Sequence, residues 1–256
     1  MRSTNRPRKR LSDRADRTVP KIMTKRSRKR HVQLTLDEAR KPTGHGGWSP
    51  RAGRPKGRKT ISHDQRPRHV ARCPVHVTLR LRSDAPVVAR DWLMTTVRGA
   101  IKDSQKAEFR IVEFNILSNH VHILAEASAT AALSRGVQGF AGRFARRLNK
   151  KLKRTGKLFA TRFHARALTS PRDVRNTLRY VLLNRKHHDT TTNFDRYWID
   201  PYSSAAWFDG WAEPIRGDWW KHELMARPPP TERARTWLLG VGWRRHGPLR
   251  FDERPA

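Results

Sequence analysis

Positive charge is concentrated in the first quarter of the chain, and this limits which part of the sequence can fold. Residues 1–70 contain 22 basic and 5 acidic side chains, so they carry half of the formal net charge of +34. Basic clusters such as Arg6–Arg10 and Lys25–Arg30 alternate with Pro, Gly and polar residues and show almost no apolar period. A segment of this kind cannot bury enough apolar surface to offset its conformational entropy. We therefore expect residues 1–68 to form a disordered basic arm.

The charge of the arm favours a nucleic-acid partner. The run Gly53–Lys59 resembles an AT-hook, which would lay Arg54 into a narrow A·T minor groove, although a solvated basic linker that touches phosphates anywhere is the alternative. An Arg-rich N-terminus could also be a mitochondrial or nuclear address. Its acidic residues and the lack of an amphipathic period favour an unfolded nucleic-acid arm instead.

Composition sets the limits for the rest of the chain. With 256 residues and 36% hydrophobic content, the sequence can form one good-sized core plus extensions. The single cysteine, Cys73, excludes an internal disulfide framework and a Cys-rich zinc site, and it fits a reducing cytoplasm. No apolar run approaches the roughly 20 residues of a membrane span. We expect a cytoplasmic protein, associated with the nucleoid of a bacterial cell and without a membrane partner.

Hydrophobic periodicity predicts a β-α-β-β-α-β-α order. The expected elements are a strand at 75–81, a helix at 87–106, strands at 109–116 and 120–126, a helix from Thr130 to near Gly156, an extended segment at 158–168, and a helix that Ser170 caps. This order is the split β-α-β pattern of ferredoxin-like folds. It predicts an α+β domain at 69–195, in which helices cover one face of an antiparallel sheet. The Trp-rich residues 196–256 should wrap the core as an irregular C-terminal extension.

Two histidines at the start of one predicted strand form the first candidate site. His120 and His122 project from the same face, because strand side chains alternate, and they could hold one metal ion. Tyr180 follows 58 residues after His122, on the polar side of the last helix together with Thr177 and Asn184. Without further landmarks, a solvated histidine pair and a surface tyrosine would be the ordinary interpretation.

Further landmarks are present, and together they resemble a known family. They are His76–Arg80, Ser118–Leu124, Gly156–His164 and Tyr180–Asn184, in this order. The chain resembles the HUH single-tyrosine transposases in these segments, especially the branch associated with repetitive extragenic palindromes. Asp200–Ser204 also looks like a segment of that family. The resemblance covers somewhat under half of the chain.

The resemblance implies a role for each matched residue. His120 and His122 would bind a divalent metal, and Tyr180 would attack a DNA phosphate, leaving a 5′-phosphotyrosine and a free 3′-hydroxyl. Asn184 would complete the metal site through its amide oxygen. Magnesium prefers oxygen ligands and a two-histidine site also suits manganese, so we expect Mg²⁺ or Mn²⁺.

Chemistry around the motif agrees with these roles. A tyrosine hydroxyl is a poor nucleophile at neutral pH unless positive charge nearby stabilises the phenolate. Glu113 and Glu126 are expected to lie off the histidine face, which disfavours a two-metal nuclease bound by carboxylates. Outside the motif, the basic side of the second helix is expected to contact DNA through four cations: Arg143, Arg146, Arg147 and Lys150.

These observations predict a metal-dependent transposase-like enzyme that cleaves and rejoins single-stranded DNA at hairpin-forming ends. The alternative is a catalytically retired relative that binds hairpin DNA or RNA as a regulator. Parts of the family exchange the tyrosine helix between two subunits, so both a monomer and a homodimer are compatible with the sequence.

Overall fold

The structure is a computed structural model, and it describes residues 67–86, 88–89, 91–188, 192–216 and 227–253. Residues 1–66 lie outside the described part. They include Arg54 and nearly all of the expected basic arm. The expectations for them therefore stay predictions. No helix in the described ranges is long and apolar enough to cross a membrane.

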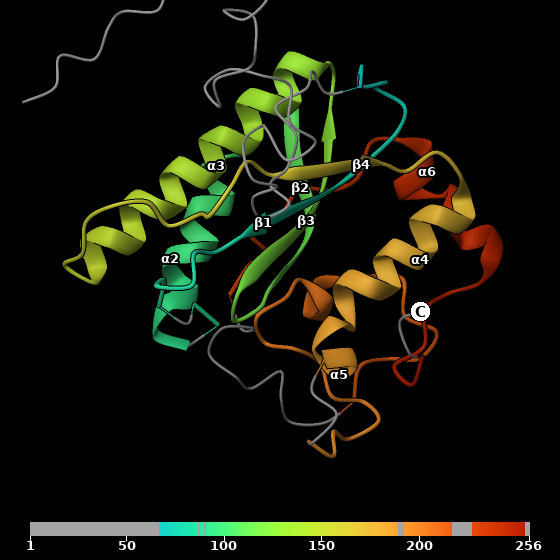
Figure 1. Cartoon of the computed structure of the whole chain (residues 1–256). Helices are drawn as coiled ribbons and strands as arrows, with labels where there is room; N and C mark the ends of the chain where they lie inside the picture. The colour runs from blue at the N-terminus through green and yellow to red at the C-terminus, as the bar shows by residue number, and fades with distance from the viewer. Residues whose placement is uncertain (1–66, 87, 90, 189–191, 217–226, 254–256) are drawn as a thin grey trace, which may run out of the picture. The chain divides into compact units, whose positions relative to one another are not determined.

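Four antiparallel strands form the centre of the fold (Figure 1). They are β1 (Val75–Arg80), β2 (Phe109–Ile116), β3 (His120–Ala127) and β4 (His164–Ala167), and they lie in the order β2-β3-β1-β4. This is the strand order of the split β-α-β pattern. The predicted ferredoxin-like sheet is therefore confirmed, with β1 and β3 at its centre.

Two helices cover one face of the sheet: α2 (Asp91–Lys102) and α3 (Thr130–Lys151). Alternate residues of β1 point to this face and are almost fully buried, together with the apolar stripe of α3, which includes Phe140 and Phe144. The ring of Phe109 lies directly against Gly136, where an added Cβ would come within 2.1 Å of it. Gly136 therefore sets how closely α3 approaches the sheet.

The last main helix, α4 (Pro171–Leu182), packs on the opposite face. Ser170 caps it as predicted, since the Ser170 hydroxyl accepts a hydrogen bond from the Asp173 backbone N–H. Its buried side, which includes Val174 and Leu178, joins Leu124 of β3 in a second apolar core. The expectation of helices on one face thus holds for α2 and α3, whereas α4 covers the other face.

Local details differ from the sequence predictions. Thr130 is not the cap of α3: the cap position is Ala129, and the Thr130 hydroxyl instead accepts the backbone N–H of His69 at 2.8 Å. The fourth strand is regular over four residues only, and before it Phe159 makes an isolated bridge to Leu81. Both details depend on contacts between segments far apart in the sequence. The local pattern of apolar and polar residues does not show such contacts.

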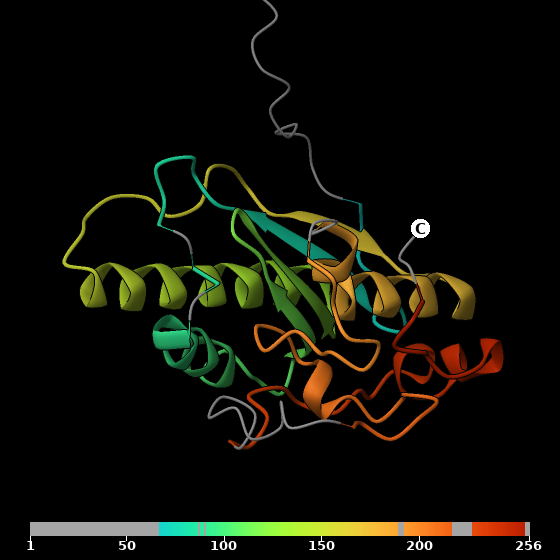
Figure 2. The same ribbon diagram turned by 90° about the horizontal axis from the view of Figure 1, so that it is seen from below.

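The C-terminal extension packs against α4 and against the same sheet face (Figure 2). Its described elements are short: η1 (Ala205–Trp207), α6 (Trp237–Gly240) and η3 (Gly242–His246). Arg175 of α4 donates to both carboxylate oxygens of Glu253, at 2.9 and 2.7 Å, and to the carbonyl oxygens of Gly247 and Pro248. The extension therefore wraps the core, as expected, while the domain boundaries stay predictions.

The expected positions of Glu113 and Glu126 were wrong. Glu113 lies opposite Leu124, and Glu126 is four residues beyond His122, so both point to the histidine face. A register shift between Ile111 and Glu113 contributes to this arrangement. Both carboxyl groups are nevertheless hydrogen-bonded to other protein groups and do not line the cavity with the histidines. Glu126 binds Arg110 and two backbone N–H groups of the extension.

Of the two buried carboxyl groups, Glu113 accepts fewer hydrogen bonds to offset the loss of water. The Ser204 hydroxyl donates to it, and burial raises the pKa of Glu113 to about 8. The folded protein therefore keeps the Glu113 proton up to about pH 8, while the unfolded chain loses it above the ordinary value of 4.5. Glu113 consequently lowers the free energy of unfolding as the pH rises from about 4.5 to about 8.

We predict that Glu113→Gln raises the melting temperature at pH 8 and changes it little at pH 4.5, since the amide keeps the Ser204 hydrogen bond without a charge. One pKa unit corresponds to about 1.4 kcal/mol, so the gain at pH 8 should reach a few kcal/mol. Thermal unfolding between pH 4.5 and pH 8 measures it. The exposed Glu108, changed to Gln, is the matched control. An equal effect of Glu113→Gln at both pH values would contradict the assignment.

Candidate active site

The sheet register brings polar side chains together on the face that α4 partly covers. Thr78 in β1 lies opposite His122 of β3 and opposite His164 of β4. Arg80 lies opposite His120, and His76 lies opposite the fourth-strand residue Arg166. Residues directly opposite in a sheet point to the same side. The central strands therefore hold both predicted histidines on one patch, beside side chains from β1 and β4.

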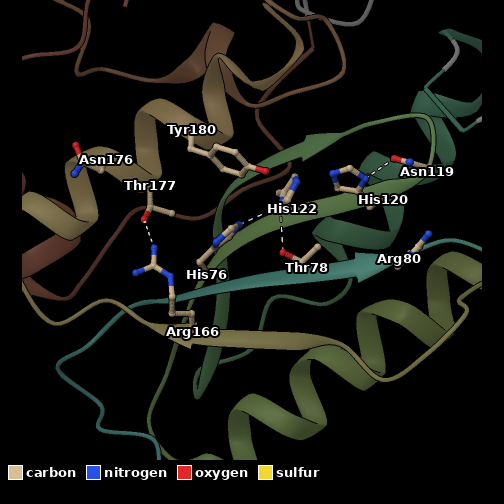
Figure 3. Close-up of a pocket in the computed structure, with 10 residues that line it drawn as sticks. All are labelled: His76, Thr78, Arg80, Asn119, His120, His122, Arg166, Asn176, Thr177 and Tyr180. Carbon is tan, nitrogen blue, oxygen red and sulfur yellow. Dashed lines mark hydrogen bonds between the residues drawn. The ribbon is translucent and has the colours of Figure 1, made fainter. Parts of the chain in front are cut away.

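Helix α4 places Tyr180 over this patch (Figure 3). The Tyr180 ring meets the His122 ring edge-on, with centroids 5.2 Å apart, and His120 and His122 lie with their centroids 4.6 Å apart. A cavity of about 640 Å³ joins them. Its lining residues are His76, Thr78, Arg80, Asn119, His120, His122, Arg166, Asn176, Thr177 and Tyr180.

The two histidines differ in their surroundings. His122 is almost fully buried, and its Nδ1 atom lies 3.0 Å from Nε2 of His76 and 3.2 Å from Oγ1 of Thr78. His120 is half-buried, and its Nδ1 atom hydrogen-bonds the side-chain oxygen of Asn119. In both rings the Nδ1 atom is engaged by protein, so Nε2 is the ring atom through which each would bind a metal.

His76 is a neutral imidazole at physiological pH. Burial, together with the positive charge of Arg166, lowers the pKa of His76 to about 4. Its ring stacks on His122 with centroids 5.1 Å apart and meets the edge of Tyr180 at 5.9 Å. His76 therefore touches both the predicted ligand and the predicted nucleophile.

One arginine is held at the mouth of the cavity by α4. Arg166 donates to the Asp173 carboxylate at 2.6 Å and to the Thr177 hydroxyl at 2.9 Å. Arg80 is exposed on the other side of the patch. No carboxylate lines the cavity in the described part of the chain. The site thus offers cations, histidines and a phenol, a combination that suits an anionic ligand such as phosphate.

Asn184 lies close in sequence to Tyr180 but does not line the cavity. Helix α4 ends at Leu182, and Asn184 begins the short helix α5 (Asn184–His188), so the two side chains do not share one regular helix face. The Asn184 side chain is fully buried, and neither its amide nitrogen nor its oxygen has a hydrogen-bond partner among the described residues. A buried amide without partners is unusual and calls for a missing water or ion.

The donor set fits a divalent metal only with ligands beyond histidine and carboxylate. Within the described residues, no three His, Cys, Asp or Glu side chains are grouped to hold a metal ion. His120 and His122 supply two ligands that Mn²⁺ or Mg²⁺ accepts, and substrate phosphate or water would complete the shell. The histidine pair therefore fits the metal that the sequence implied, while the role of Asn184, which does not line the cavity, stays a prediction.

The predicted DNA contacts on α3 lie apart from this site. Helix α3 covers the sheet face opposite α4, and Arg147 is ion-paired with Asp103. The guanidinium groups of Arg143 and Arg146 lie back along α3 over Gly139 and Gly142. Lys150 is exposed. None of these four cations lines the cavity, and their contacts with DNA stay predictions.

Sequence reasoning missed three groups of the site: His76, Thr78 and Arg166. The alternation of β1 already put His76 and Thr78 on one face, but it did not show which strand lies beside β1. The strand order of a ferredoxin-like sheet, which places β1 next to β3, was the available signal. For Arg166 no comparable signal existed, because its place depends on the Asp173 and Thr177 contacts.

Comparison with known proteins finds a similarity over the part of the chain that carries this site. Residues 69–183 match the family model described as "Transposase IS200 like". This segment is therefore similar to IS200-like transposases. The match ends between Tyr180 and Asn184, so the matched segment includes both predicted histidines and the predicted nucleophile.

One solved structure similar to the chain is described as "Structure of the REP associates tyrosine transposase bound to a REP hairpin". It has a TM-score of 0.48 and 18% sequence identity, and the alignment covers 68% of this chain and 99% of that one. The comparison with curated proteins found no match.

We predict that Asn184→Leu, a nearly isosteric change, stabilises the metal-free protein and removes its stabilisation by Mn²⁺. Removing an unsatisfied buried amide should add on the order of 1–3 kcal/mol to the free energy of unfolding. Loss of a ligand should abolish the metal-dependent rise in melting temperature. Thermal unfolding with and without Mn²⁺ measures both effects, with the exposed Asn193, outside the cavity, changed to Ala as the control. A variant that keeps the full Mn²⁺ effect would show that Asn184 is not a ligand.

Proposed function

We propose that the chain is a metal-dependent DNA strand transferase that cleaves and rejoins single-stranded, hairpin-associated DNA with Tyr180 as its nucleophile. The observation that carries this proposal is the contact between Tyr180 and the histidine pair. The phenol ring meets His122 edge-on in a cavity that His120 also lines. The similarity to IS200-like transposases supports a reaction of DNA transposition.

The proposed reaction exchanges one phosphate ester for another. The Tyr180 oxygen attacks a backbone phosphorus atom, a Tyr–O–P bond forms, and the bond from phosphorus to the 3′ oxygen breaks. The phenolic proton passes to water in the open cavity, and the departing 3′ oxygen takes up a proton to become a hydroxyl. Because the ester bond is conserved in the phosphotyrosine, a 3′-hydroxyl can later attack it and rejoin DNA without an energy source.

Residues of the sheet and α4 position the substrate for this step. Arg166, held by Asp173 and Thr177, presents its remaining N–H groups to a phosphate, and Arg80 offers a second cation across the patch. His120, His122 and Asn184 would hold Mg²⁺ or Mn²⁺, which when bound polarises the phosphate and orients it in line with the nucleophile.

We predict that Tyr180→Phe abolishes the covalent protein–DNA adduct while it leaves DNA affinity nearly unchanged, because it removes only the attacking oxygen. The test incubates each protein with single-stranded hairpin DNA and Mn²⁺ and resolves the products on a denaturing gel. Tyr197→Phe, outside the cavity, is the matched control and should form the adduct at wild-type yield. An adduct at wild-type yield in Tyr180→Phe would exclude Tyr180 as the nucleophile.

The same assay separates the enzyme from a retired relative. Alanine at both His120 and His122 should abolish the adduct and the Mn²⁺-dependent rise in melting temperature, since both ligands are lost. If the wild-type protein binds hairpin DNA tightly but forms no adduct with Mg²⁺ or Mn²⁺, the chain is a binding protein that regulates rather than an enzyme.

Arg166 gives a further prediction. Arg166→Gln should lower the rate of cleavage at saturating DNA by about 10- to 100-fold, the equivalent of one lost charge-assisted hydrogen bond of roughly 1.5–3 kcal/mol. The control is Arg172→Gln, an exposed arginine on the first turn of α4. It should weaken binding at low salt without changing the single-turnover rate. Equal single-turnover rates for both variants would contradict a phosphate contact by Arg166.

A further inference from the structure

The Nδ1 atom of His122 has two polar neighbours, and both come from β1. Nε2 of His76 lies at 3.0 Å and Oγ1 of Thr78 at 3.2 Å. Thr78 is the direct cross-strand partner of His122, and His76 is two residues away on the same face of β1. Central strands rather than loops therefore fix the three side chains relative to one another.

The chemistry of imidazole makes this contact decisive for metal binding. A neutral histidine carries one N–H, and the other ring nitrogen has the lone pair that binds a metal. If the His122 proton sits on Nδ1, Nε2 has the lone pair; if it sits on Nε2, that nitrogen cannot be a ligand. A neighbour that accepts from Nδ1 thus selects the tautomer that can bind a metal.

His76 and Thr78 differ as candidates for this neighbour. A threonine hydroxyl can donate or accept, so Thr78 allows either tautomer of His122. The Nε2 atom of His76 also donates or accepts according to its tautomer, and it accepts when the His76 proton lies on Nδ1. The shorter of the two contacts is the one to His76. His76 with its proton on Nδ1 is therefore the nearer candidate for the acceptor of the His122 Nδ1–H.

We propose that His76 is a positioning residue that accepts the His122 Nδ1–H and so keeps His122 Nε2 as a metal-binding atom. The inference rests on the proposed function for the identity of the site. Partners of this kind fix the orientation and tautomer of ligating histidines, and their removal weakens metal binding by about 10- to 100-fold. His76 touches no reacting atom in this scheme and acts through His122.

Two substitutions at the same position isolate the hydrogen bond. His76→Phe keeps an aromatic ring for Tyr180 and His122 to pack against but removes the acceptor. His76→Gln loses the ring, and its side-chain amide oxygen can reach about the position of the missing Nε2 atom. If His76 acts only through packing, His76→Phe should preserve the site better. If it acts as a hydrogen-bond acceptor, His76→Gln should preserve the site better.

The first measurement is the tautomer of His122 in the metal-free protein, read from the ring nitrogens by ¹⁵N NMR. We expect the Nδ1–H form in the wild type and in His76→Gln, and a mixture of both tautomers in His76→Phe. An Nε2–H form in the wild type, or an unchanged tautomer in His76→Phe, overturns the inference. Neither result depends on DNA cleavage.

The second measurement is the affinity for Mn²⁺ without DNA. The electron paramagnetic resonance signal of the free ion reports how much Mn²⁺ stays unbound. His76→Phe should bind Mn²⁺ at least 10-fold more weakly, and His76→Gln should recover most of the affinity. Affinity that falls equally in both variants also overturns the inference. If the tautomer and the Mn²⁺ affinity respond as expected while the wild type forms no DNA adduct, the proposed function fails and the positioning role of His76 stands. A wild type that does not bind Mn²⁺ overturns both.

Discussion

The site depends on the antiparallel pairing of β1 with β3. This pairing sets Thr78 opposite His122 and Arg80 opposite His120. Because the side-chain period of a strand is two, a slip of one residue in this register would turn the whole set to the other face. The apolar residues of β1 prevent such a slip, since they are buried under α2 and α3 on the reverse side. The core that holds the sheet thus also selects which polar groups meet.

The second core has a different effect on the same face. Apolar side chains of α4 and the C-terminal extension cover the sheet beyond Leu124, and they enclose Glu113 and Glu126. Polar side chains of this face remain accessible around the cavity, from His120 to Arg166. The carboxyl groups of this face are thereby removed from the cavity, which leaves it with a positive and neutral lining. An anionic substrate meets no repelling charge from the cavity lining.

The fold could be predicted from the sequence because its signals are local. Alternation marked β1, β2 and β3, and the Ser170–Pro171 pair marked the start of α4. Alternate positions on β3 place His120 and His122 on one face of the strand, which is also a local signal. The places of Arg166 and Asn184 could not be predicted. The first depends on the hydrogen bond from Arg166 to Asp173, and the second on the end of α4 at Leu183. The metal, the DNA target and the roles of individual residues stay predictions.

The bond network between Arg175 and the C-terminal extension bears on how a dimer could form. The helix that carries Tyr180 is tied to its own chain through Glu253 and the carbonyl groups of Gly247 and Pro248. To lend its nucleophile to a second subunit, a protomer would have to break these bonds and expose the apolar side of α4. In this structure Tyr180 lies beside the histidines of its own chain, so the proposed site would be formed within one polypeptide. Truncation of the extension before Gly247 would remove that tether together with Leu249 and Phe251 of the second apolar core, so the segment that restrains α4 is also part of what keeps it packed.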